Sequence, residues 1–225
     1  MKKMAIALDG PAGAGKSTIA KLISDNFGIP YLDTGAMYRA ITLKIKRENI
    51  ALSNETEVNR VVEDAKVDVE FSKDGQITLL DGKNCEPDIR DPKVSDMVSD
   101  VAALGVVRKK LVDLQRGIAA GQSIVVDGRD IGTNVLPDAE LKIFLTASVE
   151  ERANRRYKEL VEKNVEGVTY ESIMKNIETR DHIDSTREIS PLKKADDAIE
   201  LDTTKLNIEQ VVEAIRKMIS EKNLV

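Results

Sequence analysis

The chain has 225 residues, of which 41% are hydrophobic, 32% charged and 3% aromatic, and its formal net charge is −5. A chain of this length can bury a sizeable aliphatic core, so we expect one large domain or a domain that carries an insertion. The acidic balance and the few aromatic residues argue against a nucleic-acid partner, and the single cysteine and single histidine exclude an internal disulfide and a Cys/His zinc site.

The first part of the chain predicts alternating strands and helices. Residues 4–8 form a continuous apolar run that is typical of a buried strand, and apolar residues then recur at helical spacing over 19–27, before Gly28. Residues 31–32 predict a second strand, and the spacing over 37–45 predicts a second helix. This alternation favours a parallel sheet with helices packed on it.

Residues 50–92 have a different pattern. Apolar and polar residues alternate from 67 to 71, and Asp74-Gly75 and Asp81-Gly82 are hairpin-turn signals on either side of the apolar segment 77–80. We therefore expect a small antiparallel insertion here.

The second half of the chain returns to helices and parallel strands. Apolar spacing predicts two helices that are separated near Gly105, and the second of them ends at Gly121. Three further strands are expected at 124–127, 141–145 and 198–202. Ser148 with Glu151 predicts a capping box before an arginine-rich helix, and Asn207 predicts the cap of the last helix. The expected fold class is therefore α/β, a three-layer fold with a five-stranded parallel sheet.

The segment from Gly10 to Ser17, GPAGAGKS, fits the pattern G-x-x-x-x-G-K-[ST] and lies between the first strand and the first helix. In such a P-loop, backbone N–H groups and the helix N-terminus bind phosphate. Lys16 would reach the β and γ phosphates of ATP, and the Ser17 hydroxyl would bind Mg²⁺. A glycine-rich turn without a ligand is the alternative. The predicted ATP-binding residues are Gly10, Pro11, Ala12, Gly13, Ala14, Gly15, Lys16, Ser17 and Thr18.

Asp127 ends the strand expected at 124–127, where a carboxylate can orient Mg²⁺ directly or through water. A core strand that ends in a capping aspartate fits the same pattern. A P-loop is shared by kinases, GTPases, motors and nucleotide-gated regulators. The N-K-x-D motif of GTPases is absent from the sequence and the chain is short for a motor domain, so we favour a small-molecule kinase.

Three further segments resemble a single family. Residues 33–39, DTGAMYR, resemble the D-[ST]-G-A-x-Y-R motif of bacterial cytidylate kinases, and residues 127–133, DGRDIGT, resemble their D-G-R-D-x-G-T motif. Residues 180–187 resemble their arginine-rich segment. The resemblance covers essentially the whole chain, 1–225, as one P-loop kinase domain. It implies that residues 50–92 are a monophosphate-binding insertion and that residues 150–170 are a lid.

The resemblance also implies roles for individual residues. The residues implied to bind CMP are Thr34, Tyr38, Arg39, Ser99, Arg108, Arg129, Asp130, Arg180, Asp184 and Arg187. The implied catalytic residues are Lys16, Arg129, Arg155 and Arg156. Which arginine of the lid acts, among Arg152, Arg155 and Arg156, stays open. Several guanidinium groups can neutralise the charge of two phosphates that must approach each other. Asp130 offers a hydrogen-bond acceptor and Arg108 a donor, and together they can distinguish cytosine from uracil.

The charged residues Arg180, Asp184 and Arg187 are spaced so that a helix would place them on one face. A solvated helix with exposed salt bridges is the other interpretation of this spacing. His182 and Cys85 lack the partners that a nucleophile needs, and we expect no catalytic role for either.

The reaction implied by the resemblance is phosphoryl transfer from ATP, with Mg²⁺, to CMP or dCMP. Another small-molecule P-loop kinase and a non-catalytic nucleotide sensor are the alternatives. Residues 4–8 are too short an apolar run for a signal sequence or a membrane span, and the single Cys85 fits a reducing compartment. We therefore expect a cytoplasmic monomer without a membrane partner.

Overall fold

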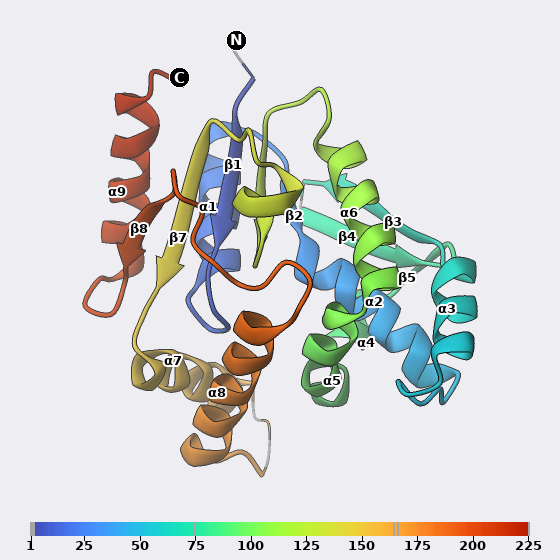
Figure 1. The fold of residues 1–225 in the computed structure, drawn as a ribbon. Coiled ribbons are helices and arrows are strands. Elements are labelled where there is room, and N and C mark those ends of the chain that lie inside the picture. Colours follow the sequence, from blue (N-terminus) through green and yellow to red (C-terminus); the bar gives the residue numbers. More distant parts are fainter. Residues whose placement is uncertain (1–2, 74, 164, 166, 225) are drawn as a thin grey trace.

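The computed structural model describes residues 3–73, 75–163, 165 and 167–224. This part of the chain contains a five-stranded sheet with the order β2-β6-β1-β7-β8 (Figure 1). Its strands are β1 (Ala5–Asp9), β2 (Tyr31–Asp33), β6 (Ile124–Gly128), β7 (Leu141–Thr146) and β8 (Ile199–Asp202). All neighbouring strands in it run parallel, so the predicted fold class is confirmed.

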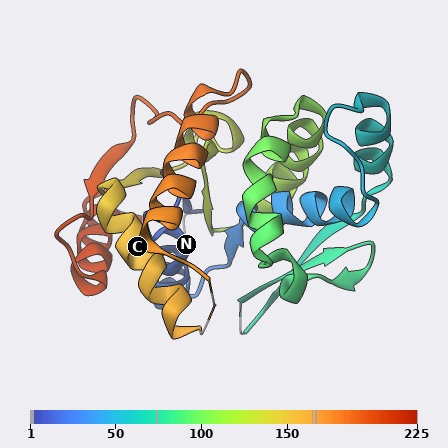
Figure 2. The same ribbon diagram turned by 90° about the horizontal axis from the view of Figure 1, so that it is seen from below.

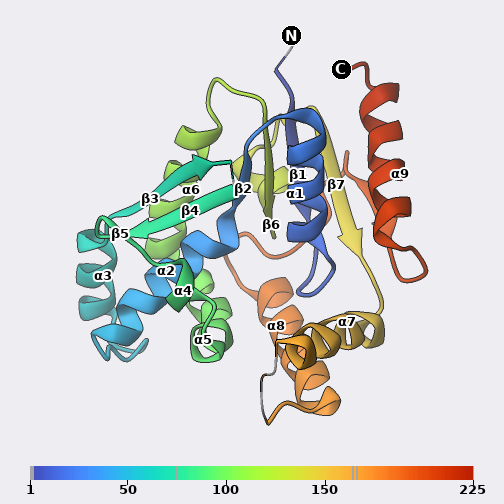
Figure 3. The same cartoon turned by 180° about the vertical axis from the view of Figure 1, so that it is seen from behind.

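Two helical layers cover the sheet because its inner strands are apolar on both faces. Ile6 and Leu8 of β1 pack with α1 (Lys16–Phe27) and α9 (Ile208–Glu221). Ala7 and Val126 point to the opposite face, which is covered by α2 (Thr34–Arg47), α5 (Pro92–Ala103) and α6 (Gly105–Ala119). Figures 1 and 3 show these helices from the two sides of the sheet. The continuous apolar run of β1 thus reflects burial on both faces.

The insertion contains the expected antiparallel sheet, of β3 (Val67–Ser72), β4 (Gly75–Leu80) and β5 (Lys83–Asn84). Figure 3 shows the β3–β4 hairpin beside α2. Asp81 and Gly82 have positive φ angles of 52° and 77°, as a tight turn requires. Of the other predicted turn, Asp74 lies outside the described residues.

The expectation of a purely antiparallel insertion was wrong for its first part. Residues Glu55–Asp64 form α3, and a short helix, α4 (Glu86–Ile89), follows β5. The Asn54 side chain caps α3 by accepting a hydrogen bond from the Glu57 amide, and Val58, Val61 and Val62 are buried on one face of the helix. The cap and this spacing are ordinary helix signals, so α3 was readable from residues 54–62.

Two more helices, α7 (Val149–Glu162) and α8 (Tyr170–Thr186), pack against each other beyond the carboxyl edge of the sheet (Figures 1 and 2). The capping box predicted at Ser148 and Glu151 was half wrong. The Ser148 hydroxyl accepts from the Glu151 amide, but the Ser148 amide donates to Thr204 Oγ1, and the Glu151 carboxylate accepts from Arg155 instead. None of the helices in the described ranges is long and apolar enough to span a membrane.

Candidate active site

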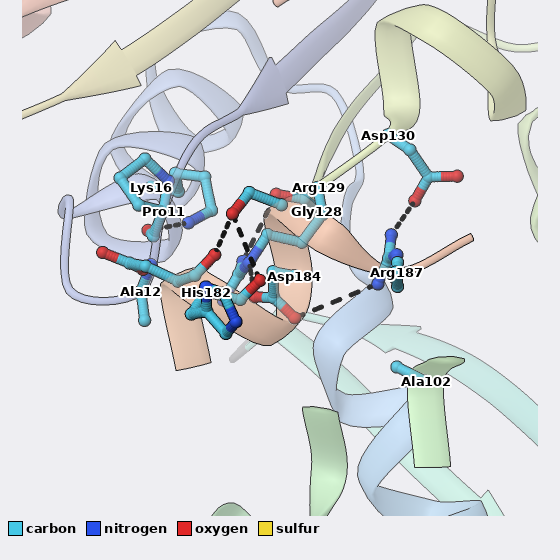
Figure 4. A network of polar contacts seen from close by, with 12 residues as sticks. Pro11, Ala12, Lys16, Ala102, Gly128, Arg129, Asp130, His182, Asp184 and Arg187 are labelled. Atoms are coloured by element: carbon cyan, nitrogen blue, oxygen red, sulfur yellow. Dashed lines mark hydrogen bonds and ion pairs between the residues drawn. The ribbon is translucent and has the colours of Figure 1, made fainter. Parts of the chain in front are cut away.

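Most of the predicted site residues converge where β1 and β6 end. The P-loop follows β1, and a π-helical turn, η1 (Ile131–Val135), follows β6 and was not predicted. Charged residues of α8 and its C-terminal end contact the P-loop and the Arg129 and Asp130 side chains, which directly precede η1 (Figure 4). The carboxyl edge of a parallel sheet is the usual place for a ligand in such folds, because the loops after neighbouring strands meet there.

Two glycines let the P-loop adopt its path. Gly10 passes so close to β7 that a Cβ atom on it would lie 2.0 Å from the Leu145 carbonyl oxygen, and Gly15 has a φ of 89°. Lys16 folds back over the loop, and its Nζ donates to the Pro11 carbonyl at 2.7 Å (Figure 4). The residues from Gly10 to Thr18 therefore form one loop and helix start, as predicted.

Lys16 and Asp127 are both buried, and their protonation is perturbed. Burial, together with the nearby Arg129, lowers the pKa of Lys16 to about 7. Burial, together with the nearby Asp33, raises the pKa of Asp127 to about 6. Perturbed charges of both signs in one small space are typical of sites that bind charged ligands.

Ser17 and Asp127, the predicted metal ligands, lie together. Ser17 Oγ donates to Asp127 Oδ2 at 2.8 Å, and the Tyr31 hydroxyl donates to the same carboxylate at 3.2 Å. These hydroxyl and carboxylate oxygens are hard donors of the kind that Mg²⁺ takes beside nucleotide phosphates. Asp127 thus accepts from two hydroxyl groups, and its role in orienting Mg²⁺ stays a prediction.

Arg39, Arg129 and Arg180 form a group that we call the guanidinium cluster. Burial, Arg129 and Arg39 lower the pKa of Arg180 to about 10, and burial also lowers the pKa of Arg39. The Nε atoms of Arg39 and Arg180 are buried and have no hydrogen-bond partner among the described residues. The cluster thus presents donors and positive charge that an anion could satisfy.

Arg129 is held by α8. Its Nε donates to Asp184 Oδ2 at 2.7 Å (Figure 4). Burial opposes the charged form of each partner, but Asp184 still raises the pKa of Arg129, and Arg129 holds the pKa of Asp184 below its ordinary value. Arg187 caps the end of α8, with its Nη1 3.9 Å from Asp184. Because Asp184 and Arg187 are only 3% and 8% exposed, the interpretation of this segment as a solvated helix was wrong.

Asp130 lies in a second polar group. Its carboxylate accepts from Arg108, from Arg187 at 3.2 Å and from Asn134 at 3.0 Å. Arg108 also lies over the Tyr38 ring, 5.8 Å from the ring centroid. The predicted acceptor and donor for the base are therefore bonded to each other in a buried position.

The remaining three residues predicted to bind CMP, Thr34, Tyr38 and Ser99, are all buried. Thr34 Oγ1 donates to the Asp127 carbonyl at 2.7 Å, so its oxygen keeps acceptor capacity. Burial raises the pKa of Tyr38 to about 12, and the Tyr38 hydroxyl has no hydrogen-bond partner in the described residues. Ser99 is buried on α5.

The arginines of α7 take three different positions. Arg152 Nη1 donates to the Ala12 carbonyl at 2.9 Å and to Asp181 at 2.6 Å. Arg155 is bonded to Thr203, at the end of β8, and Arg156 is paired with Glu159 on its own helix. In this conformation Arg152 contacts the P-loop, whereas Arg155 and Arg156 are paired with residues outside it. The catalytic roles predicted for Arg155 and Arg156 therefore stay predictions.

Two carboxylates at the site were not predicted. Asp181 Oδ1 accepts from the Ala12 amide at 3.2 Å, which ties α8 to the P-loop. Asp9 accepts from the amides of Ile131 and Gly132. Asp9 had one signal in the sequence, its place at the end of a buried strand directly before the loop; the contact of Asp181 had none, because its partners are far away along the chain.

Comparisons with known proteins show which family the chain resembles. Residues 6–221 match the family model described as cytidylate kinase. The cytidylate kinase of Carboxydothermus hydrogenoformans is 50% identical over 220 residues, which cover 98% of this chain and 99% of that protein. The cytidylate kinase of Caldanaerobacter subterraneus is 53% identical over 214 residues, covering 95% and 93%.

A solved structure also shares the fold. An uncharacterized protein from Eubacterium ventriosum superposes with a TM-score of 0.53 at 14% identity, covering 98% of this chain and 99% of that chain. This similarity shows the fold alone. On the match of the family model and the identity to curated relatives over nearly the full length, the chain belongs to the cytidylate kinase family.

Proposed function

We propose that this protein transfers the γ-phosphoryl group of ATP to the phosphate of CMP or dCMP, yielding ADP and CDP or dCDP. The observation that carries the proposal is the guanidinium cluster next to the P-loop lysine, in which the Nε atoms of Arg39 and Arg180 are buried and lack a partner among the described residues. A site with this much unsatisfied positive charge suits two phosphate groups that must approach each other. Membership of the cytidylate kinase family supports the choice of acceptor.

The chain would act mainly by positioning and by neutralising charge. The P-loop amides and Lys16 would hold the β and γ phosphates, and Lys16 would exchange the Pro11 carbonyl for them. Arg39, Arg129 and Arg180 would hold the acceptor phosphate in line. The acceptor needs no strong base, because the second pKa of a phosphate monoester is near 6.

The donor set of Ser17 and Asp127 fits Mg²⁺ bound together with ATP. When bound, the ion supplies neutralisation of charge on the phosphate oxygens. Asp127 would orient it from the end of β6, and Ser17 would orient it from the first turn of α1.

Asp130 and Arg108 would read the base. Cytosine carries an exocyclic amine, which a carboxylate can accept, and an unprotonated ring nitrogen, to which a guanidinium group can donate. Uracil reverses both groups, so it would leave the buried Asp130 facing an acceptor. Arg187 and Asn134 also donate hydrogen bonds to the Asp130 carboxylate, which fixes its position.

The decisive experiment is turnover of four ribonucleoside and four deoxyribonucleoside monophosphates with ATP and Mg²⁺. We expect CMP and dCMP to be the preferred acceptors. Preference for another acceptor would favour a different small-molecule kinase, and nucleotide binding without turnover of any acceptor would favour a nucleotide sensor. The roles of residues 50–92 as the monophosphate-binding part and 150–170 as a lid, the cytoplasmic location and the monomeric state remain predictions from the sequence.

A further inference from the structure

The Asp9 carboxylate connects the end of β1 to the start of η1. Asp9 is 4% exposed and directly precedes the P-loop. Its Oδ1 accepts from the Ile131 amide at 2.8 Å, and its Oδ2 accepts from the Gly132 amide at 2.7 Å. The first amides of a helical turn have no partner within the turn itself, so this one carboxylate fixes where η1 begins.

The segment that Asp9 holds carries the residue that would read the base. Asp130 immediately precedes Ile131, and its own carbonyl accepts from the amides of Asn134 and Val135 at 3.0 and 3.1 Å. The backbone of Asp130 is therefore part of the same hydrogen-bonded turn. A shift of the Ile131 amide would move the Asp130 carboxylate relative to Arg108.

The packing around η1 restricts the positions that this turn can take. A Cβ atom on Gly132 would lie 3.1 Å from Cδ of Lys142 and 3.4 Å from Oδ2 of Asp9. Lys142 is itself held in place by two contacts with Asp197, at 2.7 and 2.9 Å. The turn therefore has a close neighbour on the side where the Asp9 carboxylate holds it.

We propose that Asp9 is a positioning residue for recognition of cytosine, which acts through η1 on Asp130 and holds the base-reading group in a constant place relative to the P-loop. The proposal rests on the proposed role of Asp130. Asp9 makes its contacts with backbone amides, so it need not touch either nucleotide. A carboxylate offers an acceptor to each amide, whereas the isosteric asparagine offers an acceptor to one and a donor to the other.

The first test is the variant Asp9→Asn. Loss of one hydrogen bond to a charged acceptor corresponds to a decrease of about 10-fold or more in kcat/KM for CMP. We expect KM for ATP to stay within about twofold, and the ratio of kcat/KM for CMP over UMP to fall. An increased KM for ATP with an unchanged ratio would show that Asp9 shapes the P-loop alone, and would overturn the proposal.

The matched control is Glu140→Gln. The Glu140 carboxylate accepts from the Ala5 amide at 2.7 Å, at the opposite end of the same strand. This variant makes the same chemical change, away from the carboxyl edge of the sheet. We expect it to keep both KM values and the ratio of CMP to UMP.

A double-mutant cycle separates action through Asp130 from general damage. If Asp9 acts through Asp130, then Asp9→Asn lowers the ratio of CMP to UMP in the wild type and leaves it unchanged in the Asp130→Ala background. Equal effects in both backgrounds would overturn the proposal. If the wild type does not prefer CMP, or if Asp130→Ala keeps the preference, the base-reading role itself fails, and that result is visible without any Asp9 variant.

A second variant covers the case in which Asp9→Asn does not fold. Gly132→Ala adds a methyl group against Lys142 and Asp9 without changing the charge. We expect it to lower the ratio of CMP to UMP in a protein whose thermal unfolding remains cooperative. A folded Gly132→Ala protein with the wild-type ratio would contradict the claim that the position of η1 sets base recognition.

Discussion

Lys16 is only 6% exposed, and the neighbouring Arg129 adds to the effect of burial in disfavouring its charged form. The site thus stores positive charge that is poorly solvated before substrates bind. Donors that are already in place need not reorganise during the reaction, which is the main way in which such sites lower a barrier. Because these donors are fixed in place, the replacement of a single side chain should have a measurable effect on the rate.

Replacement of Lys16 by alanine should abolish most of the activity. The Lys16 side chain donates to the Pro11 carbonyl within its own loop, so we expect Lys16→Ala to fold and to lose about 10³-fold in kcat. Steady-state kinetics with a circular dichroism spectrum would test this. Lys21→Ala, on the exposed side of the same helix, is the control and should be close to wild type. A folded Lys16→Ala protein with normal turnover would remove the P-loop from the mechanism.

Arg129 should not tolerate lysine. Its Nε is used by Asp184, and the rest of its fork is directed elsewhere, with Nη1 near the Gly128 carbonyl at 3.3 Å. Lysine keeps the charge but cannot both hold Asp184 and present a fork to phosphate. We expect Arg129→Lys to lower kcat by about 100-fold, whereas Arg47→Lys, at an exposed salt bridge with Asp88, should have no effect. Equal kinetics of the two variants would show that Arg129 acts as a charge alone.

At the scale of elements, α7 and α8 are attached to the rest of the molecule through polar contacts. Arg152 and Asp181 bind the Ala12 backbone, and Arg155 binds Thr203 after β8. Polar contacts of this kind can be exchanged for contacts with phosphate, whereas a packed apolar interface cannot be rearranged so easily. This observation gives the predicted lid a physical basis.

The lid hypothesis predicts how substrates change hydrogen exchange in α7. An analogue that joins adenosine and cytidine through a phosphate chain should protect the α7 amides more than ATP or CMP alone, because only both phosphate groups together compensate the gathered arginines. Single replacements of Arg152, Arg155 and Arg156 should show which one carries the effect. Protection by CMP alone that equals that of the analogue would exclude a lid on the ATP side.

At the scale of the whole molecule, buried charge at the site lowers stability in exchange for function. Burial raises the pKa of Asp9 to about 6, from an ordinary value of 3.8. Between these two pH values the folded state binds more protons than the unfolded state. The free energy of unfolding therefore falls as pH rises through this range.

Thermal unfolding between pH 4 and 7 tests this cost. The Asp9 contribution alone amounts to about 3 kcal/mol, lost as the pH rises from about 4 to about 6. Asp9→Asn lacks this contribution, so we expect the Tm of the wild type to fall relative to the Tm of the variant over the same range. Asp127 titrates in both proteins, and its effect cancels in the comparison. Parallel pH profiles would show that Asp9 does not change its protonation there.

Predictions from the sequence succeeded where neighbouring residues carry the signal. The apolar run of β1, the Gly28 stop after α1 and the Asn207 cap of α9 were each visible within a few residues and are present in the structure. Helix α3 was missed although Asn54 is an ordinary cap, and η1 was missed because a π-helical turn has no established sequence pattern.

The amino-acid sequence alone was enough to predict the P-loop, the alternation of strands and helices and the family motifs, because each of these depends on contiguous residues. The pairing of the buried charges depends on the tertiary structure alone. Asp130 meets Arg108 and Arg187, and Asp181 meets Arg152, over separations of 22 to 57 residues. Such pairs form because parallel strands bring distant loops to one edge of the sheet and because burial there forces each charge to find a partner. No local pattern in the chain encodes which carboxylate meets which guanidinium group.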